Sequence, residues 1–338
     1  MIFITGATGL LGAHFLVELS QKNEAIRALK RKTSNLNQVQ SIFQFYFGEE
    51  GKAKFESIEW VEGDVLDIPS LDEAMKGCKA VYHCAAMVSF RRWDFRKMME
   101  INKTGTANIV NLALSHNIDH LVYISSVAAP GRDGRKGFYD ENNKWKPSDE
   151  NTGYAISKYS AENEVWRGVE EGLNVVILNP TIILGPGNWN ESSVTFFKML
   201  HKGMLFYPPG ENGFVDARDV AKIGVVLATK EIFNQRYLTV GENASFLKLF
   251  THITNRFGKK PPRFKLQSWM LAIAWRLDTF LSLFGKKQSI TKENSKSSFG
   301  VSKYSNDKVK NELGYKFYSL EETVENASNY FKSFYLNK

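Results

Sequence analysis

Tyr154 and Lys158 have the residue types and the spacing for acid–base chemistry. They stand four positions apart in a helical pattern, so their side chains share one helix face. A phenol with a pKa of about 10 is a poor acid or base at neutral pH, and a neighbouring ammonium lowers that pKa toward the working range. The same spacing recurs at Tyr304 and Lys308. We assign proton transfer to Tyr154 because only the first pair follows a strand and opens a helix.

A hydroxyl is expected at the end of the strand before that helix, where a carbonyl oxygen would be held. The apolar run 121–125 is followed by such a position, with Ser125 and Ser126 as the two candidates. We predict that Ser126 is catalytic and that Ser125 lies nearer a cofactor. Serine pairs at strand ends also cap turns, so this assignment depends on Tyr154 and Lys158.

A glycine-rich turn stands between the first strand and the first helix. Gly6 permits a tight turn, Gly9 lets the backbone approach a pyrophosphate, and Gly12 lets the helix pack closely on the strand. The amide groups and dipole of a helix N-terminus favour phosphates. The turn predicts a dinucleotide site whose contacts are Gly6, Thr8, Gly9, Leu10, Leu11 and Gly12.

Residues at the end of the second strand contact the 2′ position of the adenosine ribose in such a cofactor. An NAD site usually has an acidic residue there, but residues 25–48 contain no Asp or Glu. Lys30 and Arg31 stand there instead, and Thr33 and Ser34 follow. These groups suit a 2′-phosphate, so NADP(H) is favoured, with NAD(H) as the alternative. After the third strand, Asp64 with Val65 is predicted to contact the adenine.

Alternating strand and helix patterns must position these residues. Strands separated by helices indicate βαβ units and a parallel sheet whose ligand edge follows the strands. The expected fold class is α/β, a Rossmann doubly wound parallel sheet with a smaller, mainly helical substrate domain built from discontinuous segments. Strands are expected at 2–5, 25–29, 58–61, 80–83, 121–125, 175–178 and 236–240, and helices at 10–22, 70–76, 95–116, 152–171 and 217–229.

A change of composition after Pro180 marks the expected domain boundary. Residues 181–214 are rich in glycine, proline and aromatic side chains, and residues 243–300 have mainly helical patterns. We expect a cofactor domain of residues 1–180 plus about 215–240. The substrate-binding region would comprise 181–214 and 241–338.

Composition excludes several classes of protein. Among 338 residues there are two cysteines, which form neither a disulfide framework nor a zinc site, and no metal site is predicted. The N-terminus reads as a buried strand rather than a signal peptide, so a cytoplasmic protein is expected. The formal charge of +8 is assigned to a solvated basic surface, because no nucleic-acid motif accompanies it.

Together these marks resemble the extended (atypical) short-chain dehydrogenase/reductase superfamily, in particular its NAD-dependent epimerase/dehydratase family. Within it the chain is similar to the dihydroflavonol-reductase and 3β-hydroxysteroid-dehydrogenase-like reductases. The resemblance covers nearly the whole chain. It is carried by TGATGLLG at 5–12, GDVLD at 63–67, VYHCAA at 81–86, INKTGTANIV at 101–110, ISSVAA at 124–129, YAISK at 154–158 and NPTIILGPG at 179–187.

The resemblance implies further site residues. Ala85 and Ala86 should flank the phosphoribosyl portion of the cofactor, and Asn102 should lie at the floor of the active site. Pro180, Ile182 and Ile183 should contact the nicotinamide. Nucleotide-sugar epimerases usually have an acidic residue after the second strand and an arginine where this chain has Asn179, which weakens that alternative.

The function expected is an NAD(P)-dependent oxidoreductase that reduces a ketone or aldehyde on a hydrophobic small molecule, or oxidises the alcohol. A nucleotide-sugar epimerase or dehydratase and a non-catalytic dinucleotide sensor are the alternatives. Substrate contacts are expected from residues 87–90, Trp93, 181–214 and a helix near 268–284. That helix could instead pack on the core or touch a membrane weakly, since Lys259, Lys260, Arg263, Lys265, Lys286 and Lys287 flank it. A monomer or homodimer is expected.

Overall fold

A seven-stranded parallel sheet forms the centre of the computed structural model, which describes residues 1–131, 138–148, 151–267, 269–270 and 298–336. Its strands in spatial order are β11 (Gln235–Thr239), β7 (Val175–Pro180), β5 (His120–Ile124), β4 (Ala80–His83), β1 (Ile2–Thr5), β2 (Ile26–Lys30) and β3 (Glu59–Glu62). The order reverses between β1 and β4, and ligands bind at such a switch point. The predicted α/β, doubly wound Rossmann class is confirmed.

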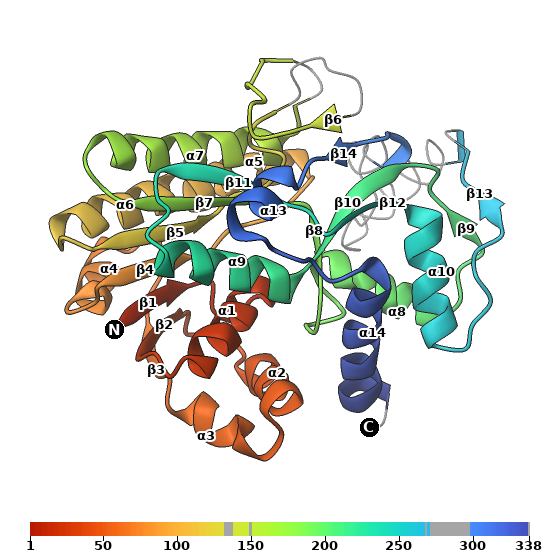
Figure 1. Ribbon diagram of the computed structural model, residues 1–338, viewed down its shortest axis with the longest axis horizontal. Coiled ribbons are helices and arrows are strands. Elements are labelled where there is room, and N and C mark those ends of the chain that lie inside the picture. Colours follow the sequence, from red (N-terminus) through yellow and green to blue (C-terminus); the bar gives the residue numbers. More distant parts are fainter. Residues whose placement is uncertain (132–137, 149–150, 268, 271–297, 337–338) are drawn as a thin grey trace.

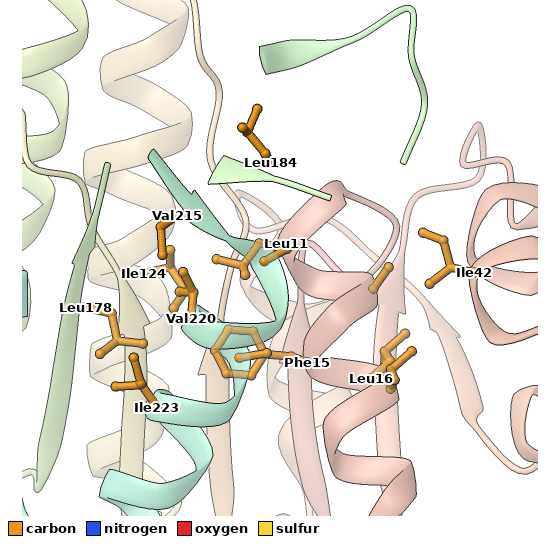
Figure 2. Close-up of a cluster of buried hydrophobic side chains, with 14 of the residues drawn as sticks. Leu11, Phe15, Leu16, Ile42, Ile124, Leu178, Leu184, Val215, Val220 and Ile223 are labelled. Carbon is orange, nitrogen blue, oxygen red and sulfur yellow. The ribbon is translucent and has the colours of Figure 1, made fainter. Parts of the chain in front are cut away.

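Helices cover both faces of this sheet (Figure 1). On one face Val122 and Ile124 of β5 pack with α1 (Leu10–Gln21) and α9 (Ala217–Thr229), as Figure 2 shows for Phe15 and Ile124. On the other face Leu121 and Tyr123 pack with α4 (Ile68–Met75), α6 (Gly105–Ser115) and α7 (Gly153–Glu170). The period of two along β5 thus builds two separate cores, and the sheet is buried on both sides.

The helix expected at 95–116 is divided into three parts. It begins as α5 (Phe95–Met99), passes through a π-helical turn (Glu100–Thr104) and continues as α6. A π-turn inserts an extra residue into the helical register, and such turns are common at functional sites. Asn102 lies in this turn and is 1% exposed.

The region after Pro180 contains more strands than expected. A three-stranded sheet of β12 (Glu242–Ser245), β10 (Glu211–Asp216) and β8 (Ile182–Leu184) lies beside α8 (Thr195–His201), α10 (Phe246–Arg256) and α14 (Leu320–Phe331). The expectation of a mainly helical region was therefore incomplete. The sequences ENGFVD and ENAS lack the apolar runs by which strands are recognised.

Short strands and helices complete the described chain. They are α2 (Asn37–Phe47), α3 (Gly51–Glu56), β6 (Phe138–Tyr139), β9 (Phe206–Tyr207), β13 (Phe264–Lys265), β14 (Lys303–Tyr304) and α13 (Asp307–Leu313). The helix predicted near 268–284 lies almost wholly outside the described residues. In the described part, no helix is both long enough and apolar enough to cross a bilayer.

Candidate active site

The glycine turn between β1 and α1 is shaped by two of its three glycines. Gly6 has a φ of +66°, and a Cβ there would lie 2.5 Å from the amide nitrogen of Ala85. A Cβ on Gly12 would lie 2.1 Å from the carbonyl oxygen of Gly6. Gly9 is the exposed N-cap of α1 and offers no side-chain cap, so first-turn amides face outward for an anion. This cradle fits a dinucleotide pyrophosphate.

The hydrophobic residues of the turn differ in their surroundings. Leu11 is 7% exposed and points into the core beside Phe15 (Figure 2), whereas Leu10 is half-buried at the helix start. Thr8 is half-buried and lines an open cavity. Among the residues predicted in this turn, Leu11 therefore contributes packing, and Thr8 faces the space a ligand would fill.

That cavity has a volume of about 570 Å³ and extends from the glycine turn to the end of β2. Arg31 and Ser34 line it and are joined by two contacts: the Arg31 amide donates to Ser34 Oγ at 3.1 Å, and the Ser34 amide donates to the Arg31 carbonyl at 2.9 Å. Lys30, the last residue of β2, is not part of its lining. The other lining residues are Thr33, Asn35, Asn37, Gln38, Ser41, Asn188, Asn190, Glu191, Phe334 and Tyr335.

Asp64 and Val65 follow β3, one strand further from the switch point. The Asp64 carboxylate accepts from the Leu66 amide at 3.0 Å and so closes its own turn. Val65 is buried, and its carbonyl accepts from the Asn108 side chain at 2.9 Å. Neither residue lines the cavity at Arg31.

Tyr154 and Ser126 are brought together where β5 ends and α7 begins. Thr152 caps α7 by accepting from the Ala155 amide at 3.1 Å, which fixes Tyr154 in the first turn. Burial raises the pKa of Tyr154, and a hydrogen bond with the Ser126 side chain acts in the opposite direction. The ring of Phe90 lies 5.8 Å from that of Tyr154.

Lys158 is 2% exposed and points toward β5. Its ammonium donates to the Ile124 carbonyl at 2.7 Å and to the Tyr123 hydroxyl at 3.1 Å. Burial lowers its pKa to about 8, while the Glu162 carboxylate raises it. The sequence predicted that Lys158 would lower the Tyr154 pKa, yet burial raises that pKa and only Ser126 opposes the rise. The Lys158 ammonium is directed to Ile124 and Tyr123 instead.

A buried polar chain continues from Lys158 to the glycine turn. The Tyr123 ring stacks on His83 with centroids 5.7 Å apart. His83 contacts Thr106 Oγ1 through Nε2 at 3.0 Å and Thr5 Oγ1 through Nδ1 at 2.6 Å. Burial, reinforced by the Lys158 charge, lowers the His83 pKa to about 3, so the imidazole is neutral at ordinary pH.

Glu162, one turn after Lys158, is a buried junction of four elements. It is 2% exposed and accepts from Ser125 Oγ at 2.5 Å and from Asn179 Nδ2 at 2.9 Å. The Arg236 guanidinium of β11 and the Trp166 indole also donate to it. The Ser125 hydroxyl, which we placed nearer a cofactor, is therefore directed into this buried network.

The Asn102 side chain fastens the loop after β4. Its Oδ1 accepts from the Met87 amide at 2.7 Å, and its Nδ2 donates to the Met87 carbonyl at 2.9 Å and to Ser157 Oγ at 3.0 Å. Asn102 thus joins the π-helical turn to the backbone of Met87 and to the Ser157 side chain of α7. Ala85 is half-buried and Ala86 exposed along the same loop.

The residues implied at the nicotinamide follow β7. Pro180 is the last residue of β7, and its carbonyl accepts from the Val127 amide at 3.1 Å. Ile182 and Ile183 are half-buried in β8 and pair with β10. These residues start from the same sheet edge as Ser126, because β5 and β7 are neighbouring parallel strands.

Sequence reasoning missed three buried polar residues of this region: Tyr123, His83 and Glu162. A signal existed for Glu162, because Tyr154, Lys158 and Glu162 repeat every four residues along one helix face. For His83 the signal was a basic residue at the end of an otherwise apolar strand, a position at which burial requires a partner.

Comparisons with known proteins agree with this geometry. The NAD dependent epimerase/dehydratase family matches residues 2–241. A putative dihydroflavonol 4-reductase of Synechocystis is 29% identical over 98% of this chain and 94% of its own. Sterol demethylase protein B of Methylococcus capsulatus is 29% identical over 77% of this chain and 75% of its own. The crystal structure of gox2253 has a TM-score of 0.79 and 28% identity, covering 98% of both chains.

The sheet order, the glycine turn and the reductase-named relative define an enzyme of the extended short-chain dehydrogenase/reductase class. The chain belongs to the NAD dependent epimerase/dehydratase family. The predicted family and the assignment as a nicotinamide-dependent oxidoreductase are thus confirmed.

Proposed function

We propose that this enzyme uses NADP(H) to reduce a ketone or aldehyde on a hydrophobic small molecule, or to oxidise the corresponding alcohol. The observation that carries the proposal is the closeness of the Ser126 and Tyr154 side chains at the ligand edge of the sheet, where the Ser126 hydroxyl lowers the Tyr154 pKa against the effect of burial. Two neighbouring hydroxyls there can both reach one substrate oxygen, Ser126 as a hydrogen-bond donor and Tyr154 as a proton donor.

The bound cofactor would supply or take up a hydride at the reacting carbon. Tyr154 Oη would give its proton to the substrate oxygen as reduction proceeds, and Ser126 Oγ would donate a hydrogen bond to that oxygen as negative charge develops. The Lys158 ammonium would hold the local potential positive, which favours the phenolate left on Tyr154. Its pKa of about 8 leaves it charged at neutral pH.

A hydrophobic substrate is favoured by the side chains beside Tyr154. The Phe90 ring contacts the Tyr154 ring, and Val88 and Trp93 of the same loop are 58% and 63% exposed. The names of the two relatives, a dihydroflavonol reductase and a sterol demethylase protein, also favour an apolar molecule. We propose that residues 181–214 and 241–338 supply the remaining substrate contacts, and that residues 1–180 with about 215–240 hold the cofactor.

The preference for NADP(H) over NAD(H) rests on the cavity at the end of β2. Arg31 with Thr33 and Ser34 offers a guanidinium and two hydroxyls, and no acidic residue occurs between 25 and 48. A guanidinium pairs strongly with a phosphate, whereas the ribose hydroxyls of NAD call for an acceptor.

The first experiment is a cofactor-oxidation screen with NADPH and NADH against ketones, aldehydes and sugar nucleotides. With a substrate in hand, Tyr154→Phe should lower kcat about 10²–10⁴-fold without weakening NADPH binding. Tyr159→Phe is the matched control, because Tyr159 lies on the same helix but stacks on Trp145 at 4.4 Å. Full turnover by a folded Tyr154→Phe enzyme would refute the assignment.

A nucleotide-sugar epimerase or dehydratase is the second candidate, favoured by the family match alone. For this alternative we expect that tightly held NAD copurifies with the protein. We also expect that a sugar nucleotide is turned over without net oxidation of the cofactor. A non-catalytic sensor would bind the dinucleotide and turn over no substrate.

We also propose that the chain acts as a monomer or as a homodimer, and that a homodimer would form through α6 and α7. We further propose a weak contact with membranes.

A further inference from the structure

Two segments far apart in the sequence form one exposed edge of the molecule. β9 and β13 pair in parallel, and the amides of Arg263 and Phe264 both donate to the Leu205 carbonyl at 3.0 Å. Figure 1 shows this pair beside α10, at the side of the molecule opposite the N-terminus. We call residues 198–207 and 256–267 the basic edge.

Large apolar side chains stand exposed on the basic edge. Leu205 is 65% exposed and Phe264 is 55% exposed. Phe264 also contacts Phe206, with ring centroids 5.7 Å apart, so its position is fixed by the strand pair. Grouped apolar side chains held in water by ordered backbone mark an interaction surface.

The two sequence segments that form the basic edge and its neighbouring helices carry charge of one sign. Residues 195–210 and 246–267 contain no Asp or Glu but eight Lys or Arg: Lys198, Lys202, Lys248, Arg256, Lys259, Lys260, Arg263 and Lys265. Lys248 and Arg256 pair with acids from other segments. Lys202, Lys259, Lys260, Arg263 and Lys265 are all exposed.

The positive charge of this edge affects the pKa of a neighbouring histidine. The pKa of His201 in α8 is lowered by burial and further by the positive charge of Lys259. Phe257 lies against the same imidazole with ring centroids 5.2 Å apart. An aromatic ring and a cationic side chain thus lie next to the same imidazole on this edge.

We propose that the basic edge docks on the surface of an anionic lipid bilayer. Leu205 and Phe264 enter the boundary between headgroups and acyl chains, and the surrounding lysines and Arg263 contact the lipid phosphates. This combination favours a bilayer over a nucleic acid. The phosphates of a nucleic acid would pair with the cations, but they offer no apolar phase for an aliphatic side chain such as Leu205. Docking would keep the enzyme where apolar substrates partition.

The test is sedimentation of the full-length protein with vesicles of phosphatidylcholine alone or with about one-third phosphatidylglycerol. Binding is expected only to the anionic vesicles and should weaken with salt. Lys260→Gln with Lys265→Gln should lower the partition coefficient roughly 25-fold, at about fivefold per charge. Leu205→Ser with Phe264→Ser should lower it at least about tenfold.

Matched controls separate the basic edge from net charge. Lys22→Gln with Lys79→Gln removes two exposed charges elsewhere and should change the partition coefficient little. Equal sedimentation with both vesicle types would overturn the proposal. The proposal would also be overturned if the charge variant lost binding while the Leu205 and Phe264 variant bound as wild type does. That result would indicate a general polyanion site. NADPH binding should persist in every variant, so this test can fail independently of the proposed reaction.

Discussion

Replacing Lys158 by methionine should abolish turnover and yet make the protein more stable. The Lys158 pKa falls from its ordinary 10.5 to about 8, so the buried charge costs about 3 kcal/mol at neutral pH. Lys158→Met removes that cost but also forfeits the hydrogen bonds that the neutral amine would make to Ile124 and Tyr123, at about 1 kcal/mol each. The free energy of unfolding should therefore rise by about 1–2 kcal/mol at pH 7.

The advantage of the variant should depend on pH in a defined direction. In the folded protein Lys158 releases its proton near pH 8, and in the unfolded chain near 10.5. Between these values the unfolded state binds more protons, so wild-type stability rises with pH relative to the variant. The advantage of Lys158→Met is complete well below pH 8 and falls by about 1.4 kcal/mol per pH unit between about pH 8 and 10.5.

Urea unfolding at pH 7, 8, 9 and 10, followed by circular dichroism, measures this difference without knowledge of the substrate. Lys22→Met is the control, because Lys22 is exposed and its replacement should give a difference that is small and independent of pH. Lower stability of Lys158→Met at pH 7, or a difference from wild type that stays constant up to pH 10, would refute the reasoning.

Three other substitutions test neighbouring parts of the site. Glu162→Gln removes a charge that raises the Lys158 pKa, so the alkaline limb of the pH profile of kcat should shift by about one unit to lower pH. Glu164→Gln is the control and should leave this limb unchanged, because Glu164 pairs with Arg167. Arg31→Ala should raise the KM for NADPH about 10–100-fold and change that for NADH little; equal effects would contradict the 2′-phosphate role. Gly12→Ala places a Cβ 2.1 Å from a carbonyl oxygen. Cofactor-binding fluorescence should therefore be lost and the melting temperature lowered. Unchanged cofactor binding would contradict the need for a glycine in this turn.

The sheet and its ligand edge were predictable because each strand carries a local signal. The run Ala80–His83 was predicted with the bounds that the structure has, and so was the helix Ala217–Thr229. The strands Glu211–Asp216 and Glu242–Ser245 were not predicted. Polar residues and glycine dominate them, and they become strands by pairing with each other and with Ile182–Leu184.

The positions of the candidate site residues were predictable, but the directions of their side chains were not. The Ser126 side chain lies close enough to Tyr154 to lower its pKa, at the strand end and helix start where the sequence placed them. Ser125 turns to Glu162, and Lys158 turns to β5, because buried donors take the acceptors that tertiary packing brings to them. Those acceptors come from other elements, and periodicity along one segment says nothing about them.

The Glu162 junction also imposes an order on the maturation of the enzyme. Its carboxylate on α7 is met by Arg236, which lies 74 positions later in the chain, on the edge strand β11. During synthesis the helix that carries Tyr154 and Lys158 therefore emerges before the cation that neutralises its buried acid. Until β11 adds to the sheet, a nascent chain can form the glycine turn and fold around it, but it holds an unpaired charge behind the reacting groups. We therefore expect catalytic competence to come late in folding, when β11 completes the seven-stranded sheet.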